Sequence, residues 1–127
     1  TKMISLAKGT SELRIVSDQI GRPVDTTTLA KACFAVINNP KSGLYHISGN
    51  GPATSWAGFA QAIFTAAPPA HLLKVNVTDI PAKDYPTAAK RPAYSVLDNR
   101  KFEADYGVTL EDWQDMIDLA WTEYIGA

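Results

Sequence analysis

The sequence predicts an α/β fold with about three short strands and about five helices. Apolar residues recur at helical spacing in three long stretches: 25–40, 54–69 and 109–127. Residues 72–80 alternate between apolar and polar side chains, which is typical of a half-buried strand. Two further apolar runs lie between turn-forming residues, at 12–18 and 43–49. Helices and strands therefore alternate along the chain.

The first part of the chain is predicted to run helix, strand, turn and helix. Residues 1–10 have the apolar spacing of the last turns of a helix, and a glycine is placed to end it. The strand at 12–18 directs Leu13 and Ile15 to one face. The helix at 25–40 is predicted to bury one stripe: Leu29, Ala32, Cys33, Val36 and Ile37.

The alternation continues through the rest of the chain. A strand at 43–49 lies between two glycines, and a helix follows at 54–69. One face of the strand at 72–80 is formed by three residues: Leu73, Val75 and Val77. A short helix is expected at 98–107. The terminal helix is predicted to bury its own stripe: Trp113, Met116, Ile117, Ala120, Trp121 and Tyr124.

Composition excludes several classes of protein. The net charge is −1 and 20% of residues are charged, whereas a general nucleic-acid binder carries a basic surplus, so no nucleic acid is expected as a partner. The single cysteine, Cys33, excludes an intrachain disulfide and favours a reducing, cytoplasmic setting. No apolar run approaches the roughly 20 residues of a membrane span. The chain begins with Thr inside an expected helix, which indicates a fragment, a processed chain or a start that is not included in the sequence.

Few residues have the surroundings that catalysis or metal binding requires. The glycines around the "GNGPA" turn fit neither common nucleotide fingerprint. His46 and His71 lie far apart, without a cysteine or carboxylate at ligand spacing, so no metal site is expected. Two interpretations of Trp56 stay open. It packs in the core, or it contacts a ligand from its place at a helix start beside loops.

Two polar stretches are not explained by core packing. "DQIGRP" places a carboxylate, an amide and a guanidinium just beyond a strand, and ligands of open α/β sheets bind outside the carboxyl ends of strands. In "AKRPAYS", Arg91 offers a planar fork of donors to phosphate and Lys90 adds a point charge. Neighbouring prolines stiffen this segment and lower the entropy lost on binding. The alternative is a solvated loop in which Arg91 pairs with a surface carboxylate.

These stretches together resemble one family. "RIVSDQIGRP", "GLYHISGNGPATSWAGFAQAIF", "YPTAAKRPAYSVLDNRKF" and "LEDWQDMIDLAW", in this order and spacing, resemble the C-terminal half of the dTDP-4-dehydrorhamnose reductases. Those enzymes belong to the extended short-chain dehydrogenase/reductase superfamily, which has a Rossmann-type fold. The resemblance covers essentially the whole chain and implies that residues 1–127 form a single substrate-binding domain.

The resemblance also implies an activity for the complete enzyme. The family reduces the C4 keto group of dTDP-4-dehydro-6-deoxy-L-mannose with NADPH or NADH and produces dTDP-L-rhamnose, a precursor of cell-surface polysaccharides such as O-antigen. Its catalytic Y-x-x-x-K motif and its nucleotide fingerprint lie upstream, and no Y-x-x-x-K occurs in this chain. No catalytic or cofactor-binding residue is therefore expected here, and the chain alone is expected to be inactive.

The candidate substrate-binding residues are Arg91, Gln19, Asp18, Lys90, Ser95 and Trp56. By the resemblance, Arg91 faces the pyrophosphate of the dTDP-sugar and Gln19 also contacts substrate. Asp18 orients its loop, Ser95 offers a hydroxyl, and the role of Lys90 stays open.

Three alternatives remain beside the reductase. One is another nucleotide-sugar epimerase or reductase of the same superfamily, and the second is a non-catalytic regulatory subunit with this fold. The third is a stand-alone globular domain that binds no small molecule. The terminal helices and the strand at 12–18 are expected to expose apolar surface without the upstream half. We therefore expect the isolated chain to self-associate, and whether the native enzyme is a homo-oligomer is left open.

Overall fold

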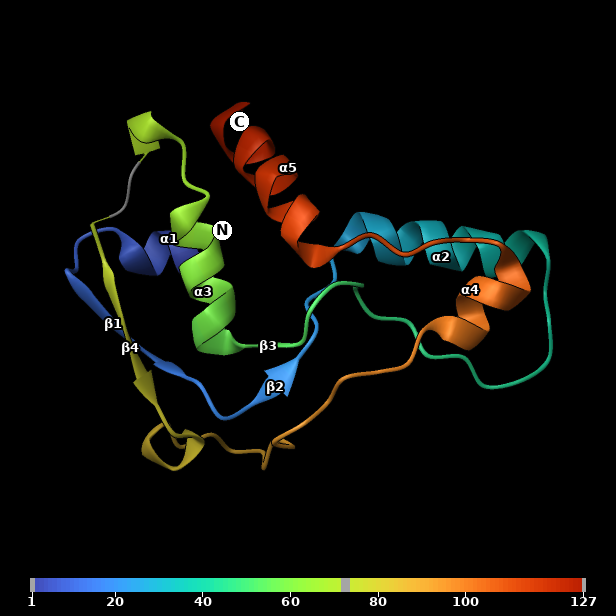
Figure 1. Cartoon of the computed structure of the whole chain (residues 1–127), viewed down its shortest axis with the longest axis horizontal. Helices are drawn as coiled ribbons and strands as arrows, with labels where there is room; N and C mark the ends of the chain where they lie inside the picture. Colours follow the sequence, from blue (N-terminus) through green and yellow to red (C-terminus); the bar gives the residue numbers. More distant parts are fainter. Residues whose placement is uncertain (1, 72–73, 127) are drawn as a thin grey trace.

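The computed structural model describes residues 2–71 and 74–126, and it is a mixed α/β structure, as the sequence predicts (Figure 1). The α-helices of this part are α1 (Lys2–Ala7), α2 (Thr26–Asn38), α3 (Trp56–Thr65), α4 (Arg100–Tyr106) and α5 (Trp113–Gly126). Its strands are β1 (Glu12–Val16), β2 (Ile20–Gly21), β3 (Thr54–Ser55) and β4 (Asn76–Ile80). Two short 3₁₀ helices complete it: η1 (Pro69–His71) and η2 (Ala82–Asp84).

β1 and β4 form a parallel pair that α1 and α3 cover on one face (Figure 1). The register runs from Glu12 opposite Asn76 to Val16 opposite Ile80. The covered face packs on Ala7, Ala60 and Phe64 through four strand-segment residues: Leu13, Ile15, Val75 and Val77. The predicted faces of both strands are confirmed for these residues, whereas Leu73 lies outside the described residues.

A second core cluster joins α1, α3 and α5. Trp113 and Trp121 are buried in it together with Ile4, Ala67 and Ile117. Each indole N–H donates to a backbone carbonyl, Trp113 to Pro52 at 2.7 Å and Trp121 to Ile63 at 2.9 Å. Because both polar ends are satisfied, the rings are buried without an unpaired donor. The predicted stripe of α5 is confirmed except at Ala120, which is exposed.

The third cluster lies between α2 and α4, away from the β1–β4 pair (Figure 1). Ala32, Phe102 and Leu110 are its buried members. The predicted stripe of α2 is wrong in part, because the helix is rotated toward Phe102. Its inward face consists of Thr28, Ala32, Ala35 and Val36, whereas Leu29, Cys33 and Ile37 are exposed.

The predicted strand at 43–49 is not formed, because a strand needs a hydrogen-bonded partner and no described segment pairs with it. The buried amide of Asn99 holds one end of this stretch instead. Its Oδ1 accepts from the Ser48 N–H at 3.0 Å, and its Nδ2 donates to the Ser48 carbonyl at 3.1 Å and to Asn50 Oδ1 at 3.1 Å. One side chain therefore fixes the end of this stretch at Ser48 and Asn50.

Replacement of Asn99 by alanine is expected to lower the free energy of unfolding by about 1–3 kcal/mol, because it leaves the buried Ser48 N–H without a partner. Urea denaturation of the two chains measures this difference. Asn38→Ala is the matched control, because Asn38 is exposed at the end of α2 and should change stability by no more than about 0.5 kcal/mol. Equal stability of Asn99→Ala and the wild type would show that solvent replaces the amide.

Helix starts follow local capping chemistry. The Asp25 carboxylate accepts from the N–H groups of Thr27 at 2.7 Å and Thr28 at 3.0 Å, and so begins α2. Partial burial acts to raise the pKa of Asp25, but hydrogen bonds from Thr28 and Thr27 outweigh it and hold the pKa below its usual value. Ser55 begins α3, where its hydroxyl accepts from the Gly58 N–H at 3.0 Å.

Candidate functional site

Three segments that are far apart in the sequence meet at Ile20. On one side, β2 pairs antiparallel with β3, with Ile20 opposite Ser55. On the other side, the Ile20 N–H donates to the Ala93 carbonyl at 2.8 Å, and the Ser95 N–H donates to the Ile20 carbonyl at 2.8 Å. Residues 20–21, 54–55 and 93–95 thus form a narrow ribbon, which we call the central ribbon.

The central ribbon brings together the two polar stretches that the sequence singles out, "DQIGRP" and "AKRPAYS". Extension of the register by one residue places Gln19 opposite Trp56 on one side and Ala93 on the other. Side chains alternate between the faces of a ribbon, so Gln19, Gly21 and Ser95 belong to the same face. A Cβ at Gly21 would lie 3.1 Å from the Ser95 hydroxyl oxygen, which agrees with this placement.

Lys90 and Arg91 lie on the loop that leads into the central ribbon. Both side chains are exposed. Within residues 2–71 and 74–126, neither makes an ion pair or a side-chain hydrogen bond. The alternative in which Arg91 pairs with a surface carboxylate is therefore not what the described structure shows. The cationic pair keeps its donors available to a ligand.

Asp18 is engaged within the protein. Its Oδ1 accepts from the Ala82 N–H at 2.8 Å, which ties the turn after β1 to the start of η2. This contact agrees with the expectation that Asp18 orients its loop. Ser95 is partly engaged as well, since its hydroxyl donates to the Ile20 carbonyl at 3.2 Å and its oxygen still can accept.

Trp56, at the start of α3, is 53% exposed. The interpretation that it packs in the core is therefore wrong. Two further exposed aromatic residues flank the cationic loop, Tyr85 at 58% and Tyr94 at 66%. Sequence reasoning missed these tyrosines as candidates. The sequence pattern that could have identified them is an aromatic residue on each side of a Lys-Arg pair in a loop stiffened by prolines.

Arg22, the arginine of "DQIGRP", forms a hydrogen bond within the protein. Its Nη1 donates to the Leu97 carbonyl at 3.4 Å, which joins the turn to the segment after the central ribbon. Next to it, Asp98 forms an ion pair with Arg100 at 2.5 Å. Hydrogen bonds from the Arg100 side chain and backbone hold the pKa of Asp98 well below its usual range. Asp98 is therefore ionised and is not available as a proton donor.

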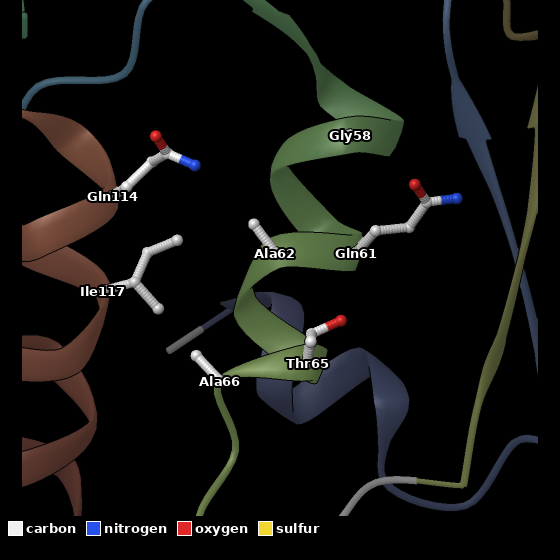
Figure 2. Close-up of a pocket in the computed structure, with 7 residues that line it drawn as sticks. All are labelled: Gly58, Gln61, Ala62, Thr65, Ala66, Gln114 and Ile117. Carbon is white, nitrogen blue, oxygen red and sulfur yellow. The ribbon is translucent and has the colours of Figure 1, made fainter. Parts of the chain in front are cut away.

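A shallow groove lies between α3 and α5 (Figure 2). The described residues that line it do not belong to the central ribbon. Figure 2 shows Ile117 of α5 directed toward Ala62 and Ala66 of α3, with Gln114 at one end. None of the residues that line it is titratable, and none is a predicted site residue. The groove thus provides no group for acid–base chemistry.

Neither a cluster of metal ligands nor a membrane-spanning helix is found in the described part of the chain. Its His, Cys, Asp and Glu residues form no group of three or more that could hold a metal ion. None of its helices has the length and the apolar character to cross a bilayer.

The fold and the ribbon define a class: an α/β protein in which an exposed cationic pair, without an ion-pair partner in the described residues, leads into a ribbon of three segments. The chain belongs to the RmlD substrate binding domain family, whose model matches residues 1–125. The resemblance inferred from the motifs is confirmed.

Relatives of known name agree. The chain is 36% identical over 121 residues to the dTDP-4-dehydrorhamnose reductase of Sinorhizobium fredii, and the alignment covers 90% of this chain and 40% of that protein. A crystal structure of a dTDP-4-dehydrorhamnose reductase from Clostridium acetobutylicum matches 99% of this chain, with a TM-score of 0.86 and 32% identity, over 43% of its own chain. The reductase from Bacillus anthracis, solved in complex with NADP, matches 96% of this chain with a TM-score of 0.84 and 30% identity, over 42% of its own chain.

The chain spans about 40% of the length of the relatives it matches, and it corresponds to their C-terminal part. These relatives have a Rossmann-like fold, so the expectation of a C-terminal portion of a Rossmann-type enzyme is confirmed.

Proposed function

We propose that residues 1–127 form a single substrate-binding domain of a dTDP-4-dehydrorhamnose reductase. The complete enzyme would reduce the C4 keto group of dTDP-4-dehydro-6-deoxy-L-mannose and release dTDP-L-rhamnose, in the cytoplasm. The family match and the named relatives support this class. The observation that carries the proposal for this chain is the exposed Lys90–Arg91 pair, which has no ion-pair partner in the described structure and leads directly into the central ribbon.

Each candidate residue has a part in holding the substrate. Arg91 binds the pyrophosphate with its planar fork of N–H donors, and Lys90 adds positive charge. Gln19, directly before the central ribbon, donates to or accepts from the nucleotide-sugar, and the Ser95 oxygen accepts a further hydrogen bond. Trp56 covers the ligand with its exposed ring. Asp18 holds the η2 loop in place and does not contact the ligand.

Binding of this kind contributes to catalysis by orientation. A substrate fixed at its pyrophosphate presents its sugar at one distance and angle to the reaction centre, which removes much of the entropy barrier. The prolines on both sides of the cationic pair, Pro86 and Pro92, restrict the loop before the ligand arrives. Less conformational freedom is then lost on binding.

The nicotinamide cofactor supplies the hydride in the complete enzyme. The residues of this chain do not fit such a cofactor, since the chain has no glycine fingerprint and its Gly49 and Gly51 belong to a turn joined to α5 through Asn50 and Glu111. NADPH or NADH is therefore assigned to the upstream part of the enzyme, as is the tyrosine that acts as general acid.

The 127-residue chain is expected to give no reductase activity, because it has no Y-x-x-x-K motif. The complete polypeptide that contains it should oxidise NADPH when dTDP-4-dehydro-6-deoxy-L-mannose is added. The measurement is the loss of nicotinamide absorbance with each protein. Turnover by the isolated chain contradicts the assignment of a binding role to it. A complete polypeptide that binds dTDP but never oxidises NADPH or NADH would favour the non-catalytic subunit.

A further inference from the structure

The loop that carries the cationic pair is attached to the protein mainly through its two ends. Residues 83–95 are all exposed. Between Pro86 and Pro92 the described structure gives a single hydrogen bond, from the Thr87 hydroxyl to the Ala89 carbonyl at 2.8 Å. The prolines restrict the shape of the loop, but they do not place it relative to the rest of the protein. Contacts outside the loop therefore set the position of the cationic pair.

The turn at 18–22 holds both ends of this loop (Figure 1). At the start of the loop, Asp18 Oδ1 accepts from the Ala82 N–H at 2.8 Å. At its end, the backbone N–H and carbonyl of Ile20 both pair with the segment 93–95, each at 2.8 Å. The loop thus leaves this turn and returns to it two residues further along.

Arg22 makes a third attachment, at the point where the backbone pairing stops. A parallel pairing that places Ile20 beside Tyr94 would continue with Arg22 beside Val96. The backbone hydrogen bonds of that next step are not formed in the described structure. Instead, Arg22 Nη1 donates to the Leu97 carbonyl at 3.4 Å. A side chain therefore joins the two segments beyond the last backbone contact between them.

The surroundings of Arg22 hold its side chain between these segments. Its Nε is buried and has no hydrogen-bond partner among the described residues, so this part of the guanidinium is not solvated. Hydrogen bonds from Arg100 and, to a smaller extent, the positive charge of Arg22 hold the pKa of Asp98 well below its usual range. The ionised Asp98 in turn attracts Arg22. The carbonyl and the carboxylate both draw the guanidinium toward the segment that follows the loop.

We propose that Arg22 is a positioning residue for the substrate, which fixes the segment after the loop and thereby the place of Arg91 at the pyrophosphate. Arg91 lies directly before the central ribbon, so any movement of the ribbon's third segment moves its guanidinium as well. Arg22 does not contact the ligand itself, because it follows Gly21 in the chain and belongs to the opposite face from Gln19. The inference rests on the proposed function, because it requires a ligand that Arg91 binds.

A double-mutant cycle in the complete polypeptide tests whether Arg22 acts through Arg91. Arg22→Met removes the guanidinium and keeps most of the side-chain volume. Calorimetry should show dTDP binding weakened about fivefold by Arg22→Met in the wild type, but less than about twofold in the Arg91→Ala background. Unchanged affinity in the wild type, or equal weakening in both backgrounds, overturns the proposal.

The conservative variant Arg22→Lys separates the loss of the contact from the change of residue. Its ammonium can still donate to the Leu97 carbonyl, so dTDP affinity should stay within about twofold of the wild type. An affinity as low as that of Arg22→Met contradicts the proposed contact.

Arg100→Met is the matched control for charge. It removes one positive charge from a nearby side chain whose ion-pair partner, Asp98, belongs to the same segment. It should therefore leave dTDP affinity unchanged. If Arg100→Met weakens binding as much as Arg22→Met does, the effect is one of general charge and the proposal is wrong.

Hydrogen exchange without ligand distinguishes failure of this inference from failure of the proposed function. The Ser95 N–H donates to the Ile20 carbonyl, and Arg22→Met should speed its exchange at least about tenfold, whereas Arg100→Met should not. Unchanged exchange at Ser95 removes the positioning role. Faster exchange with unchanged dTDP affinity leaves Arg22 a structural role only, which also overturns the proposal. If Arg91→Ala itself leaves dTDP binding unchanged, the proposed pyrophosphate site is wrong, and the substrate role of Arg22 is wrong with it.

Discussion

Replacement of Arg91 by alanine is expected to weaken the binding of dTDP by at least about tenfold, because a charge-assisted hydrogen bond contributes roughly 1.5–3 kcal/mol. Arg91 is the strongest candidate because its guanidinium is exposed, has no ion-pair partner in the described part of the chain, and lies directly before the central ribbon. Alanine removes the donors without changing the fold of an exposed loop. Isothermal calorimetry with dTDP measures the change.

Arg14→Ala is the matched control for this variant. Arg14 is also exposed, but it lies on β1, on the opposite face from Leu13 and Ile15, and should leave dTDP affinity unchanged. The titration is made on the 127-residue chain and on the complete polypeptide. If Arg91→Ala weakens dTDP binding in both proteins, the pyrophosphate site is already formed in the 127-residue chain. Unchanged affinity of Arg91→Ala in the complete polypeptide contradicts the assignment of the pyrophosphate to Arg91.

Phe102→Ala is expected to lower the free energy of unfolding by about 3–5 kcal/mol, the largest stability effect we expect from a single substitution in this chain. Phe102 is fully buried between α2 and α4. It stacks on Tyr106 with ring centroids 4.9 Å apart and meets Tyr45 edge-on at 6.4 Å. Its removal leaves a cavity that the rigid helices cannot fill. The free energy of unfolding of a typical domain is about 5–15 kcal/mol, so a loss of this size removes a large part of the stability. Urea denaturation followed by circular dichroism measures the loss.

Phe34→Ala provides the contrast for Phe102→Ala. Phe34 is 63% exposed on the outer face of α2, so its truncation should change the stability of the isolated chain by no more than about 0.5 kcal/mol. Equal effects of the two substitutions in the isolated chain would contradict the described packing of α2 on α4.

Local sequence patterns were sufficient for most helices and for the parallel pair. The alternation of Val75 and Val77 with polar neighbours, and the spacing of Trp113, Ile117 and Trp121, each assign a buried face from the chain's own geometry. The terminal helices also show where local patterns stop. They were expected to expose apolar surface in the isolated chain, and Leu6, Leu119 and Ile125 are exposed. Exposed apolar residues of α2, which were not expected, are Leu29, Phe34 and Ile37.

The predictions from sequence were wrong where the structure of a segment depends on the element that packs or pairs with it. Residues 43–49 have a strand pattern, but a strand forms only when another backbone supplies its hydrogen bonds, and Asn99 supplies them at one end alone. The rotation of α2 is of the same kind, since its sequence offers apolar residues on two faces and the packing of Phe102 and Leu110 selects the one that contains Ala32. The sites of β2 and β3 could not be found either, because two-residue pairings carry almost no periodic signal.

By itself, the sequence determined the α/β class, the family and the residue types of the candidate site, because these depend on periodicity and on motifs that are local in the chain. Only the tertiary structure brings Trp56 and Ser95 close to Gln19, through the two pairings of Ile20. It also leaves the Trp56 side chain exposed. It also decided that Asp18 and Arg22 have hydrogen-bond partners, whereas the Arg91 side chain has none among the described residues. The physical reason is that hydrogen bonds between distant segments fix which side chains have a partner, and no local pattern encodes those pairings.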